Sequence, residues 1–307
     1  MRIAIMGAGA LGGYVGGRLA ACGNDVVLIA RGAHLEAIRK DGLFVKSPKG
    51  DLHLPQIHAT DDPVSVGVVD YILFFVKNFD VKTSAIQMMP MIGADTTIIT
   101  FQNGVSAPEI VAGVTGSDNV LPGVIRFPAD IKSPGVVRHS APIDIVIFGE
   151  RTGGGSPRCA AIAEQMAKAN LMVRVADDIM QELWEKMTMQ ASFASISALT
   201  RLDIGPIREN ADSAKLFRAA MAEAEAVALA ELPRLETGMA KRQWEFLLSI
   251  PPAVHASMRD DLERGKRIEI DSLSGEIAAL GKKHGIATPL HETFVSLLAP
   301  SAEGVPG

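Results

Sequence analysis

The sequence contains few cysteines, and the two that are present do not form a recognisable site. Cys22 and Cys159 are the only cysteines among 307 residues, and they lie far apart in the chain. Neither has a second cysteine or a histidine at the spacing typical of a metal site. Isolated cysteines of this kind are typical of buried, small apolar side chains in a reducing compartment. We therefore expect a cytoplasmic protein without a metal site.

Long apolar runs and clusters of basic residues are also missing. No stretch reaches the roughly 18 uninterrupted apolar residues that a membrane-spanning helix needs, so we expect no membrane segment. Met1 leads directly into an apolar segment, without the charged region and cleavage site of a secretory signal. The formal net charge is −5, and no basic run is present to neutralise phosphates. General nucleic-acid binding is therefore not expected.

The composition is that of a globular protein with two domains. The chain has 307 residues, of which 48% are hydrophobic and 21% are charged, which is enough for two domains of ordinary size. Strand-like and helix-like segments alternate up to about Asp177, and beyond it only helical patterns occur. We expect a nucleotide-binding domain over 1–176 and a helical domain over 177–307.

The first domain is predicted to have an α/β, Rossmann-like fold, because alternation of this kind favours a parallel sheet with helices on both faces. Helices are expected after the predicted strands Arg2–Met6, Tyr71–Val76 and Thr96–Phe101, and again over Arg158–Ala169. A hairpin or irregular excursion is expected within Leu43–Ala59, and an antiparallel pair extending the sheet over Val136–His139 and Ile143–Phe148. The remaining predicted strands are Arg2–Met6, Asp25–Ala30, Tyr71–Val76, Thr96–Phe101 and Met172–Val175.

The second domain is predicted to be all-α. Its residues are rich in Ala, Leu, Met and Glu at helical spacing, and Gly205-Pro206 and Pro251-Pro252 interrupt the pattern. The predicted helices are Ile179–Leu199, Ser213–Leu232, Gly238–Leu248, Ala253–Glu263 and Ser272–His284.

A glycine-rich motif follows the first apolar run. The residues GAGALG at 7–12 come after Ile3–Met6, a helical pattern follows them, and a second apolar run ends at Ala30. Strand, glycine turn, helix and strand in this order are the context in which GxGxxG indicates a dinucleotide site. Gly7 permits the tight turn, Gly9 lets the backbone approach a pyrophosphate, and Gly12 lets the helix pack closely on the sheet. The helix N-terminus offers N–H groups to the phosphates.

The residue after the second strand bears on the identity of the cofactor. An NAD site usually has Asp or Glu there to bind the ribose 2′-hydroxyl, whereas this chain has Arg31. A guanidinium suits a 2′-phosphate, which favours NADP(H). The alternatives are an NAD or FAD site, or a surface arginine without a role.

Two polar residues follow the next two strands. Lys77 comes after DYILFFV, so its ammonium is expected at the ligand edge of the sheet, where it could contact a cofactor phosphate or ribose. Asn103 has the matching place after the next strand and could contact a nicotinamide. The alternatives are a solvated lysine and an Asn-Gly turn chosen for its conformation.

One face of the helix predicted over Ile179–Leu199 carries Lys186, Gln190 and Ala194, each four residues apart. Apolar neighbours would favour release of the ammonium proton, so Lys186 could give a proton to a carbonyl oxygen that receives hydride. A lone lysine on an amphipathic helix is more often a surface residue. Ser257 and Glu269, taken alone, are ordinary residues.

Further short motifs occur in order along the chain. They are Arg31-Gly32, the lysine after a strand at 77, Gln102-Asn103-Gly104, Ser133-Pro134-Gly135-Val136, Leu183-Trp184-x-Lys186, Ser257-Met258-x-x-Asp260, Ile268-Glu269-Ile270-Asp271, and Lys283-His284-Gly285-Ile286-Ala287-Thr288-Pro289. With GAGALG, which alone is shared by many Rossmann enzymes, this ordered set resembles the ketopantoate reductase (2-dehydropantoate 2-reductase) family nearly from end to end.

The resemblance implies that NADPH reduces a 2-oxo acid to a 2-hydroxy acid without a metal. It implies 2-dehydropantoate, reduced to pantoate in pantothenate biosynthesis, or a related branched 2-oxo acid as substrate. Lys186 would donate the proton and orient the substrate carbonyl, Glu269 would contact the cofactor and act in the closed site, and Ser257 would bind the substrate carboxylate. The other implied cofactor contacts are Gly7, Ala8, Gly9, Ala10, Leu11, Gly12, Arg31, Lys77 and Asn103, and Asn103 would also border the substrate.

The chain departs from the family pattern beside the substrate. Pantoate-forming enzymes commonly have asparagines four and eight residues after the catalytic lysine, where this chain has Gln190 and Ala194. Gln keeps an amide on a longer arm, but Ala removes the hydrogen bond. Because a site built to bind a hydroxyl disfavours analogues without one, the substrate is expected to be ketopantoate or a larger or more apolar 2-oxo acid.

Two alternative functions stay open. β-Hydroxyacid, opine and glycerol-phosphate dehydrogenases also join a Rossmann domain to helices, although the ordered motifs disfavour them. A non-catalytic NADP(H) sensor would keep GAGALG and Arg31 but would need neither Lys186 nor Glu269. A homodimer through the helical domain is common for such folds, but the sequence does not decide it.

Overall fold

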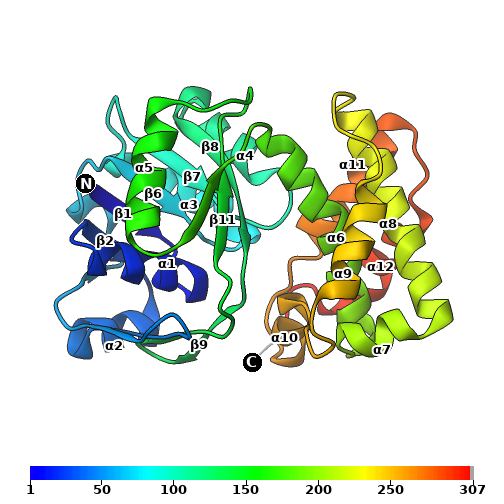
Figure 1. Ribbon diagram of the computed structural model, residues 1–307, viewed down its shortest axis with the longest axis horizontal. Coiled ribbons are helices and arrows are strands. Elements are labelled where there is room, and N and C mark those ends of the chain that lie inside the picture. The colour runs from blue at the N-terminus through cyan, green and yellow to red at the C-terminus, as the bar shows by residue number, and fades with distance from the viewer. Residues whose placement is uncertain (305–307) are drawn as a thin grey trace. The chain divides into compact units, whose positions relative to one another are not determined.

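The chain divides into two compact units. The structure is a computed structural model (Figure 1) that describes residues 1–304, except for the side chain of residue 117. The first unit holds residues 1–102 and 106–179, and the second holds Asn103–Val105 and the chain from Met180 on. The chain thus passes from the first unit to the second three residues beyond the boundary predicted at 176.

The core of the first unit is an eight-stranded sheet with the order β12-β11-β8-β7-β6-β1-β2-β5. All neighbours are parallel except β8 and β11. In the central register, Ile5 of β1 lies opposite Leu28 of β2 and Leu73 of β6. The strands are β1 (Arg2–Met6), β2 (Asp25–Ile29), β5 (His58–Thr60), β6 (Tyr71–Phe74), β7 (Thr97–Thr100), β8 (Val120–Arg126), β11 (Ile145–Phe148) and β12 (Met172–Val175).

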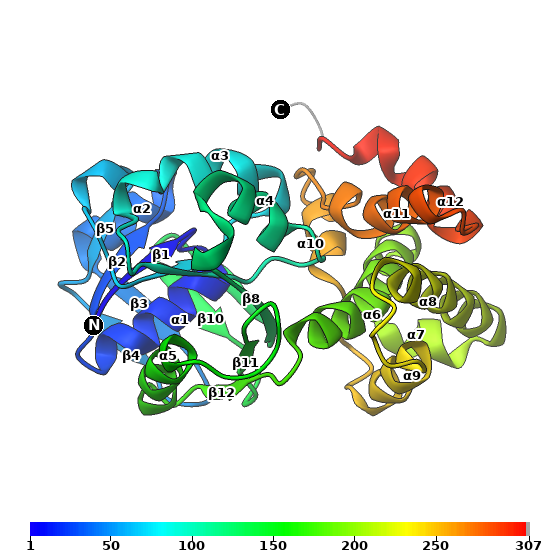
Figure 2. The same cartoon turned by 90° about the horizontal axis from the view of Figure 1, so that it is seen from above.

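Helices cover both faces of this sheet, as Figure 2 shows. Successive strand residues point to opposite faces, so Ile3 and Ile5 join one buried cluster with α1 and α5, whereas Ala4 and Met6 join another with α3 and α4. These helices are α1 (Ala10–Ala21), α3 (Val81–Gln87), α4 (Ala107–Thr115) and α5 (Pro157–Lys168); α2 (Gly32–Asp41), which was not expected, completes the set. The predicted Rossmann-like fold class is confirmed.

Short 3₁₀ turns connect several of these elements. They are η1 (Pro63–Ser65), η2 (Asn78–Asp80), η3 (Met89–Met91), η4 (Ser117–Asn119) and, near the end of the described chain, η6 (Ala299–Ser301).

A second, four-stranded sheet has the order β4-β3-β10-β9. Its strands are β3 (Leu43–Lys46), β4 (Leu52–Leu54), β9 (Ala129–Ser133) and β10 (Val136–His139). The hairpin expected within Leu43–Ala59 is present as the antiparallel pair β3–β4.

The prediction that Val136–His139 and Ile143–Phe148 form one antiparallel pair is wrong. Strand β10 pairs with β3 and β9 in the small sheet, whereas β11 pairs with β8 and β12 in the large one. The tight turn lies before β10 rather than after it, because Gly135 has a φ of +78° that a hairpin turn can use. Ser140-Ala141-Pro142 instead carries the chain from one sheet to the other.

Helix α1 lies between the two sheets, and paired glycines make this possible. A Cβ on Gly16 would lie 2.8 Å from Cγ1 of Ile5 in the large sheet. A Cβ on Gly13 would lie 2.9 Å from Cγ2 of Val137 in the small sheet. Only glycine lets the helix backbone approach both sheets so closely.

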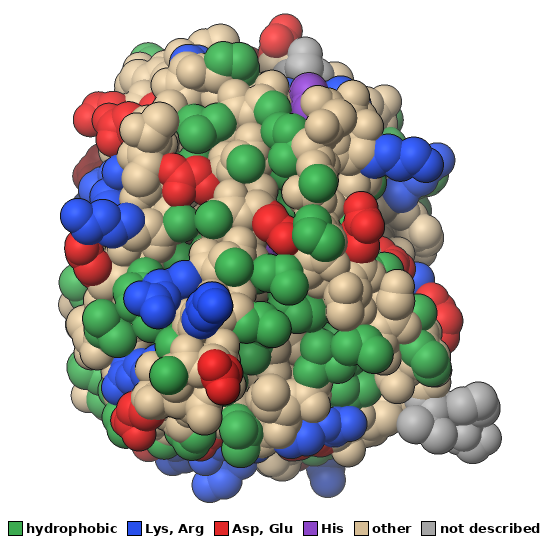
Figure 3. Space-filling view, turned by 90° about the vertical axis from the view of Figure 1, so that its right-hand side faces the viewer, with side chains coloured by type: hydrophobic (Ala, Val, Ile, Leu, Met, Phe, Trp, Pro, Cys, Tyr) green, Lys and Arg blue, Asp and Glu red, His purple; other side chains and the backbone are tan. Residues whose placement is uncertain are grey.

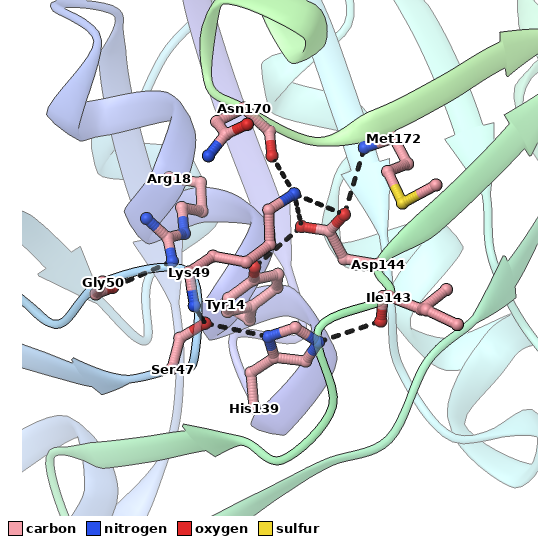
Figure 4. A network of polar contacts seen from close by, with 10 residues as sticks. All are labelled: Tyr14, Arg18, Ser47, Lys49, Gly50, His139, Ile143, Asp144, Asn170 and Met172. Carbon is pink, nitrogen blue, oxygen red and sulfur yellow. Dashed lines mark hydrogen bonds and ion pairs between the residues drawn. The ribbon is translucent and has the colours of Figure 1, made fainter.

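A buried polar network beside α1 connects the two sheets, as Figure 4 shows. Asp144 is fully buried at the start of β11 and accepts hydrogen bonds from Lys49 Nζ (2.8 Å), the Tyr14 hydroxyl (2.8 Å) and the Met172 N–H (3.1 Å). Burial, followed by the hydrogen bond to Asp144, raises the pKa of Tyr14 to about 12. Because Lys49 belongs to the β3–β4 turn, the network ties the small sheet to the edge of the large one.

The second unit consists of helices, with no strand among its described residues. The helices are α6 (Ile179–Thr200), α7 (Ile204–Glu209), α8 (Ala211–Glu231), α9 (Met239–Ser249), α10 (Ser257–Glu263), the π-helical turn η5 (Asp271–Gly275), α11 (Glu276–His284) and α12 (Pro289–Leu298). The all-α prediction is confirmed. Helix α10 is shorter than expected because Ala256 before it is extended, and α7 and α12 were not expected.

Candidate nucleotide-binding and catalytic site

The glycine loop joins the end of β1 to α1 and is tied to the end of β2. The N–H groups of Gly7 and Ala8 both donate to the carbonyl oxygen of Ile29, at 3.2 and 2.8 Å. Gly7 has a φ of +94°, and a Cβ there would lie 2.8 Å from the Val76 nitrogen. The loop conformation therefore depends on glycine at this position.

The N-terminus of α1 is open for an anion. Gly9 is the N-cap, no side chain caps the helix, and the first turn carries no acidic residue. A Cβ on Gly9 would meet nothing within 4 Å, whereas a Cβ on Gly12 would lie 2.4 Å from the Gly7 carbonyl oxygen. Open space above uncapped N–H groups fits the pyrophosphate of a dinucleotide.

Arg31 lies beside this loop at the carboxyl end of β2. Its side chain is 60% exposed, its Nη2 donates to Gln87 Oε1 at 3.1 Å, and its Nη1 lies 4.0 Å from Asp80 Oδ2. Lys77 is the half-buried N-cap of η2, the turn that contains Asp80. The structure therefore brings the segments carrying both basic residues to one edge of the sheet.

His34 is a residue of this region that the sequence analysis missed. The Gly135 N–H donates to His34 Nδ1 at 3.0 Å, so the ring proton is on the buried Nε2. Burial lowers the pKa of His34, and the backbone of Ala8 partly opposes this shift. A neutral ring thus holds the β9–β10 turn beside the glycine loop. No motif marks it.

In the second unit, α6 carries Lys186 at its half-buried edge. Trp184 and Met187, on either side, are almost completely buried and fix the rotation of the helix. Gln190 is half-buried, and Ala194 is fully buried. The methyl group of Ala194 is therefore covered in this conformation.

Glu185 beside Lys186 has a structural partner. Its carboxylate accepts hydrogen bonds from Arg242 Nε (2.8 Å) and Gln243 Nε2 (2.6 Å), both from α9. The pair holds α6 against α9 near the position of Lys186.

Ser257 is exposed at the first position of α10. An ion pair and two polar contacts hold this end of the helix: Arg259 Nη1 lies 2.6 Å from Asp203 Oδ1, and His255 lies 3.2 Å from Asp203 and 3.1 Å from Asp260. Ser257 itself is left for a ligand or solvent by this arrangement.

Glu269 is 7% exposed and stands just before the π-helical turn η5. Ser272 Oγ in that turn donates to the carbonyl oxygen of Glu269 at 3.2 Å. The turn containing Asn103 groups with the same unit, and a Cβ on Gly104 would lie 2.7 Å from the Ser272 carbonyl oxygen. The structure therefore places the segments of Asn103 and Glu269 side by side.

His291 of α12 is fully buried near the same turn. Its Nε2 lies 2.9 Å from the carbonyl oxygen of Ala220, and its Nδ1 lies 2.9 Å from Ser274 Oγ. Burial lowers its pKa from 6.5 to about 4, so the ring is neutral at pH 7.

The depressed pKa of His291 predicts an acid-sensitive fold. Between pH 6.5 and 4 the unfolded chain binds a proton that the folded chain excludes, so stability present above this window is lost as the pH falls through it. The free energy of unfolding should decrease by about 2 kcal/mol from this residue between pH 7 and pH 5. Urea unfolding at both pH values should show a smaller decrease for His291→Asn. Equal decreases in both proteins would contradict the assignment.

Comparisons with known proteins agree with this architecture. The family model described as ketopantoate reductase PanE/ApbA matches residues 3–153, and the model of its C-terminal part matches residues 178–302. A 2-dehydropantoate 2-reductase of Mesorhizobium japonicum is 31% identical over an alignment of 320 positions, and this alignment covers 97% of each chain. The chain belongs to the ketopantoate reductase family.

Solved structures of this ketopantoate reductase family superpose closely on the chain. The PanE/ApbA family ketopantoate reductase of Ralstonia eutropha has 31% identity and a TM-score of 0.90, covering 98% of both chains. The 2-dehydropantoate 2-reductase of Geobacter metallireducens has 31% identity and a TM-score of 0.91, covering 98% of this chain and 100% of its own.

The surface of this ketopantoate reductase family member mixes apolar and polar side chains. Figure 3 shows one face of the molecule, on which hydrophobic side chains lie among polar and charged ones. Among residues 1–304, no helix is long and apolar enough to span a membrane. Large exposed hydrophobic residues of the second unit are Leu202, Leu216, Phe246, Leu248 and Leu297.

Proposed function

We propose that the protein reduces a 2-oxo acid to a 2-hydroxy acid with NADPH, and that the substrate is 2-dehydropantoate or a related branched 2-oxo acid. The observation that carries this proposal is the 31% identity to a 2-dehydropantoate 2-reductase over 97% of both chains. The nucleotide edge of the sheet supports it, because the loop, helix terminus and guanidinium needed for an NADP(H) site occur together there.

The first unit would hold the cofactor. The uncapped N–H groups after Gly9 fit the pyrophosphate, and Arg31 with Lys77 fits the 2′-phosphate by charge. Asn103 and Glu269, whose segments adjoin in the second unit, would contact the nicotinamide end. When bound, NADPH supplies the hydride.

The second unit would supply the proton and bind the acid. Lys186 would hold a proton at Nζ and give it to the carbonyl oxygen of the substrate, so that the product leaves as a neutral alcohol group. Ser257, exposed at the start of α10, would donate a hydrogen bond to the substrate carboxylate. Gln190 would present an amide to the rest of the substrate from the same helix as Lys186.

The alternative is an NADP(H) sensor without turnover. It would keep the glycine loop and Arg31, but it would need neither the half-buried lysine on α6 nor the buried carboxylate of Glu269. NADPH oxidation at 340 nm with a panel of branched 2-oxo acids separates the two. Turnover supports the reductase, and tight NADPH binding without turnover across the panel supports the sensor. A cytoplasmic location remains part of the proposal.

The exposed Arg31 provides a test of cofactor choice. Arg31→Gln removes the charge expected to bind the 2′-phosphate, without disturbing the core, because the side chain is 60% exposed. We expect the Kd for NADPH to rise about 10- to 100-fold, the size of a lost charge-assisted hydrogen bond, with little change for NADH. Fluorescence titration with both nucleotides measures this.

Arg39→Gln is the matched control. Arg39 lies in the last turn of α2, at the opposite end of that helix from Arg31, and it pairs with Asp61 at 2.9 Å. Its NADPH affinity should equal that of the unmodified protein. Equal losses for both nucleotides in Arg31→Gln would contradict a 2′-phosphate contact.

A further inference from the structure

Three fully buried polar side chains meet inside the second unit. Ser195 Oγ of α6 lies 2.7 Å from Ser274 Oγ of η5, which lies 2.9 Å from His291 Nδ1 of α12. On its other side, His291 Nε2 lies 2.9 Å from the carbonyl oxygen of Ala220 in α8. One network thus connects four elements that are far apart in the sequence.

The order of the protons starts from His291. Ala220 offers only a carbonyl, so His291 Nε2 must donate and Nδ1 must accept. Ser274 Oγ is the hydroxyl within reach of Nδ1, so its single proton points there. The Ser195 hydroxyl lies 2.7 Å from Ser274 Oγ and 2.9 Å from the carbonyl oxygen of Ala191, and both oxygens can accept its proton. The hydrogen bonds therefore run from Ser274 through His291 to Ala220, and Ser195 contacts Ser274 from α6.

The turn that carries Ser274 is irregular and needs external support. The Gly275 N–H donates to the Ile270 carbonyl oxygen five residues earlier at 2.9 Å, which widens the helix into a π-turn. π-Turns are rare, and they are frequently found at functional sites. This turn begins two residues after Glu269, and Ser272 is bonded to the Glu269 carbonyl. Holding the turn therefore holds Glu269.

The opposite ends of the network are also fixed. Ser195 lies on α6, nine residues after Lys186 on the same rigid helix. The Glu223 carboxylate of α8 accepts from the N–H groups of Leu290 and His291 at 3.1 and 3.2 Å, which fixes the first turn of α12. The network therefore connects the helix of Lys186 to the turn of Glu269.

We propose that Ser195, Ser274 and His291 are positioning residues that set the place of Glu269 relative to Lys186. The inference rests on the proposed function, because it assigns Glu269 and Lys186 to one site. The three side chains contact neither cofactor nor substrate, and act through the π-turn.

Ser274→Ala tests the network directly. It leaves His291 Nδ1 without a donor, and we expect kcat for 2-oxo acid reduction to fall about tenfold or more, the rate equivalent of one unmade buried hydrogen bond. The KM for the 2-oxo acid should change less than twofold. In a Glu269→Gln background, the same substitution should lower kcat less than twofold further. Equal losses in both backgrounds would overturn action through Glu269.

Two substitutions of His291 separate positioning from packing. Asn places an acceptor near the position of Nδ1 and can still bond to Ser274, whereas Gln places a donor near Nε2 and cannot. We expect His291→Asn to restore most of kcat and His291→Gln to resemble Ser274→Ala, although both remove the ring. Thr293→Ala, on the exposed side of α12, should have the activity of the unmodified protein. Equal kcat values for the Asn and Gln variants would contradict the proposal.

Amide exchange supplies a measurement independent of activity. The Leu273 and Gly275 amides both bond to the Ile270 carbonyl, so they report on the π-turn itself. Ser274→Ala and His291→Gln should speed their exchange about tenfold, and Thr293→Ala should not. Unchanged exchange in the first two would overturn the network's hold on the turn. If the unmodified protein had no turnover, the proposed function would fail, while exchange would still decide this point.

Discussion

Lys186→Ala should lower kcat for 2-oxo acid reduction by about 10² to 10⁴, the range that a positioned proton donor contributes. The substitution removes the Nζ proton, so the developing alkoxide would have to take a proton from water. Lys186 is assigned to the substrate carbonyl, whereas the proposed pyrophosphate and 2′-phosphate contacts come from the first unit, so the Kd for NADPH should stay within about twofold. Stopped-flow measurement of NADPH oxidation, together with fluorescence titration of NADPH, gives both values.

Lys241→Ala is the control for this result. Lys241 is an exposed lysine on α9 of the same unit, so its removal tests the general effect of losing one positive charge. Its kcat should match that of the unmodified protein. If Lys186→Ala retained full turnover, another group would have to donate the proton, and the role of Lys186 would be wrong.

Adding one methyl group to the glycine loop should weaken NADPH binding at Gly9 and destabilise the fold at Gly12. At Gly9 the backbone has φ −78° and ψ −145°, so φ is outside the left-handed region, and a Cβ meets nothing within 4 Å. Gly9→Ala should therefore fold normally while the methyl group occupies the space of the pyrophosphate. We expect the Kd for NADPH to rise about 10- to 100-fold, as lost hydrogen bonds to a charged group would produce.

Gly12→Ala should instead damage the fold. Its Cβ would lie 2.4 Å from the Gly7 carbonyl oxygen and 3.0 Å from Cγ2 of Ile5, so the loop or the helix must shift. We expect a loss of about 1–3 kcal/mol in unfolding free energy, typical of overpacking. Thermal unfolding of both variants, with and without NADPH, measures the loss of stability and the stabilisation by NADPH. A normal NADPH affinity in Gly9→Ala would show that the pyrophosphate does not approach this residue.

The predicted parts of the fold are those with strong local signals. The buried strands β1 and β6 are largely continuous apolar runs, and GAGALG predicts both the turn after β1 and the start of α1. The small sheet lacks such a signal, because β4 and β9 are short and partly exposed. One indirect signal for the small sheet is present in the sequence: the glycines at 12–13 and 16–17 leave two faces of α1 free for close packing.

Some parts of the candidate site could also be predicted from the sequence, and others could not. The position of Arg31 and Lys77 at one edge of the sheet could be predicted, because the carboxyl ends of parallel strands meet there. The network of Ser195, Ser274 and His291 could not, because its members are 79 and 17 residues apart and follow no helical or strand period. The π-turn also escapes sequence analysis, since one extra residue in a turn leaves the apolar pattern almost unchanged.

The central claim is that this chain transfers hydride from NADPH to a 2-oxo acid. NADPH that carries deuterium in both C4 positions allows the transferred hydrogen to be followed into the product by NMR, with 2-dehydropantoate and a panel of branched 2-oxo acids as acceptors. Hydride transfer would give a 2-hydroxy acid with deuterium at C2 and one NADP⁺ per product molecule. Tight NADPH binding with no labelled product from any acceptor would contradict it.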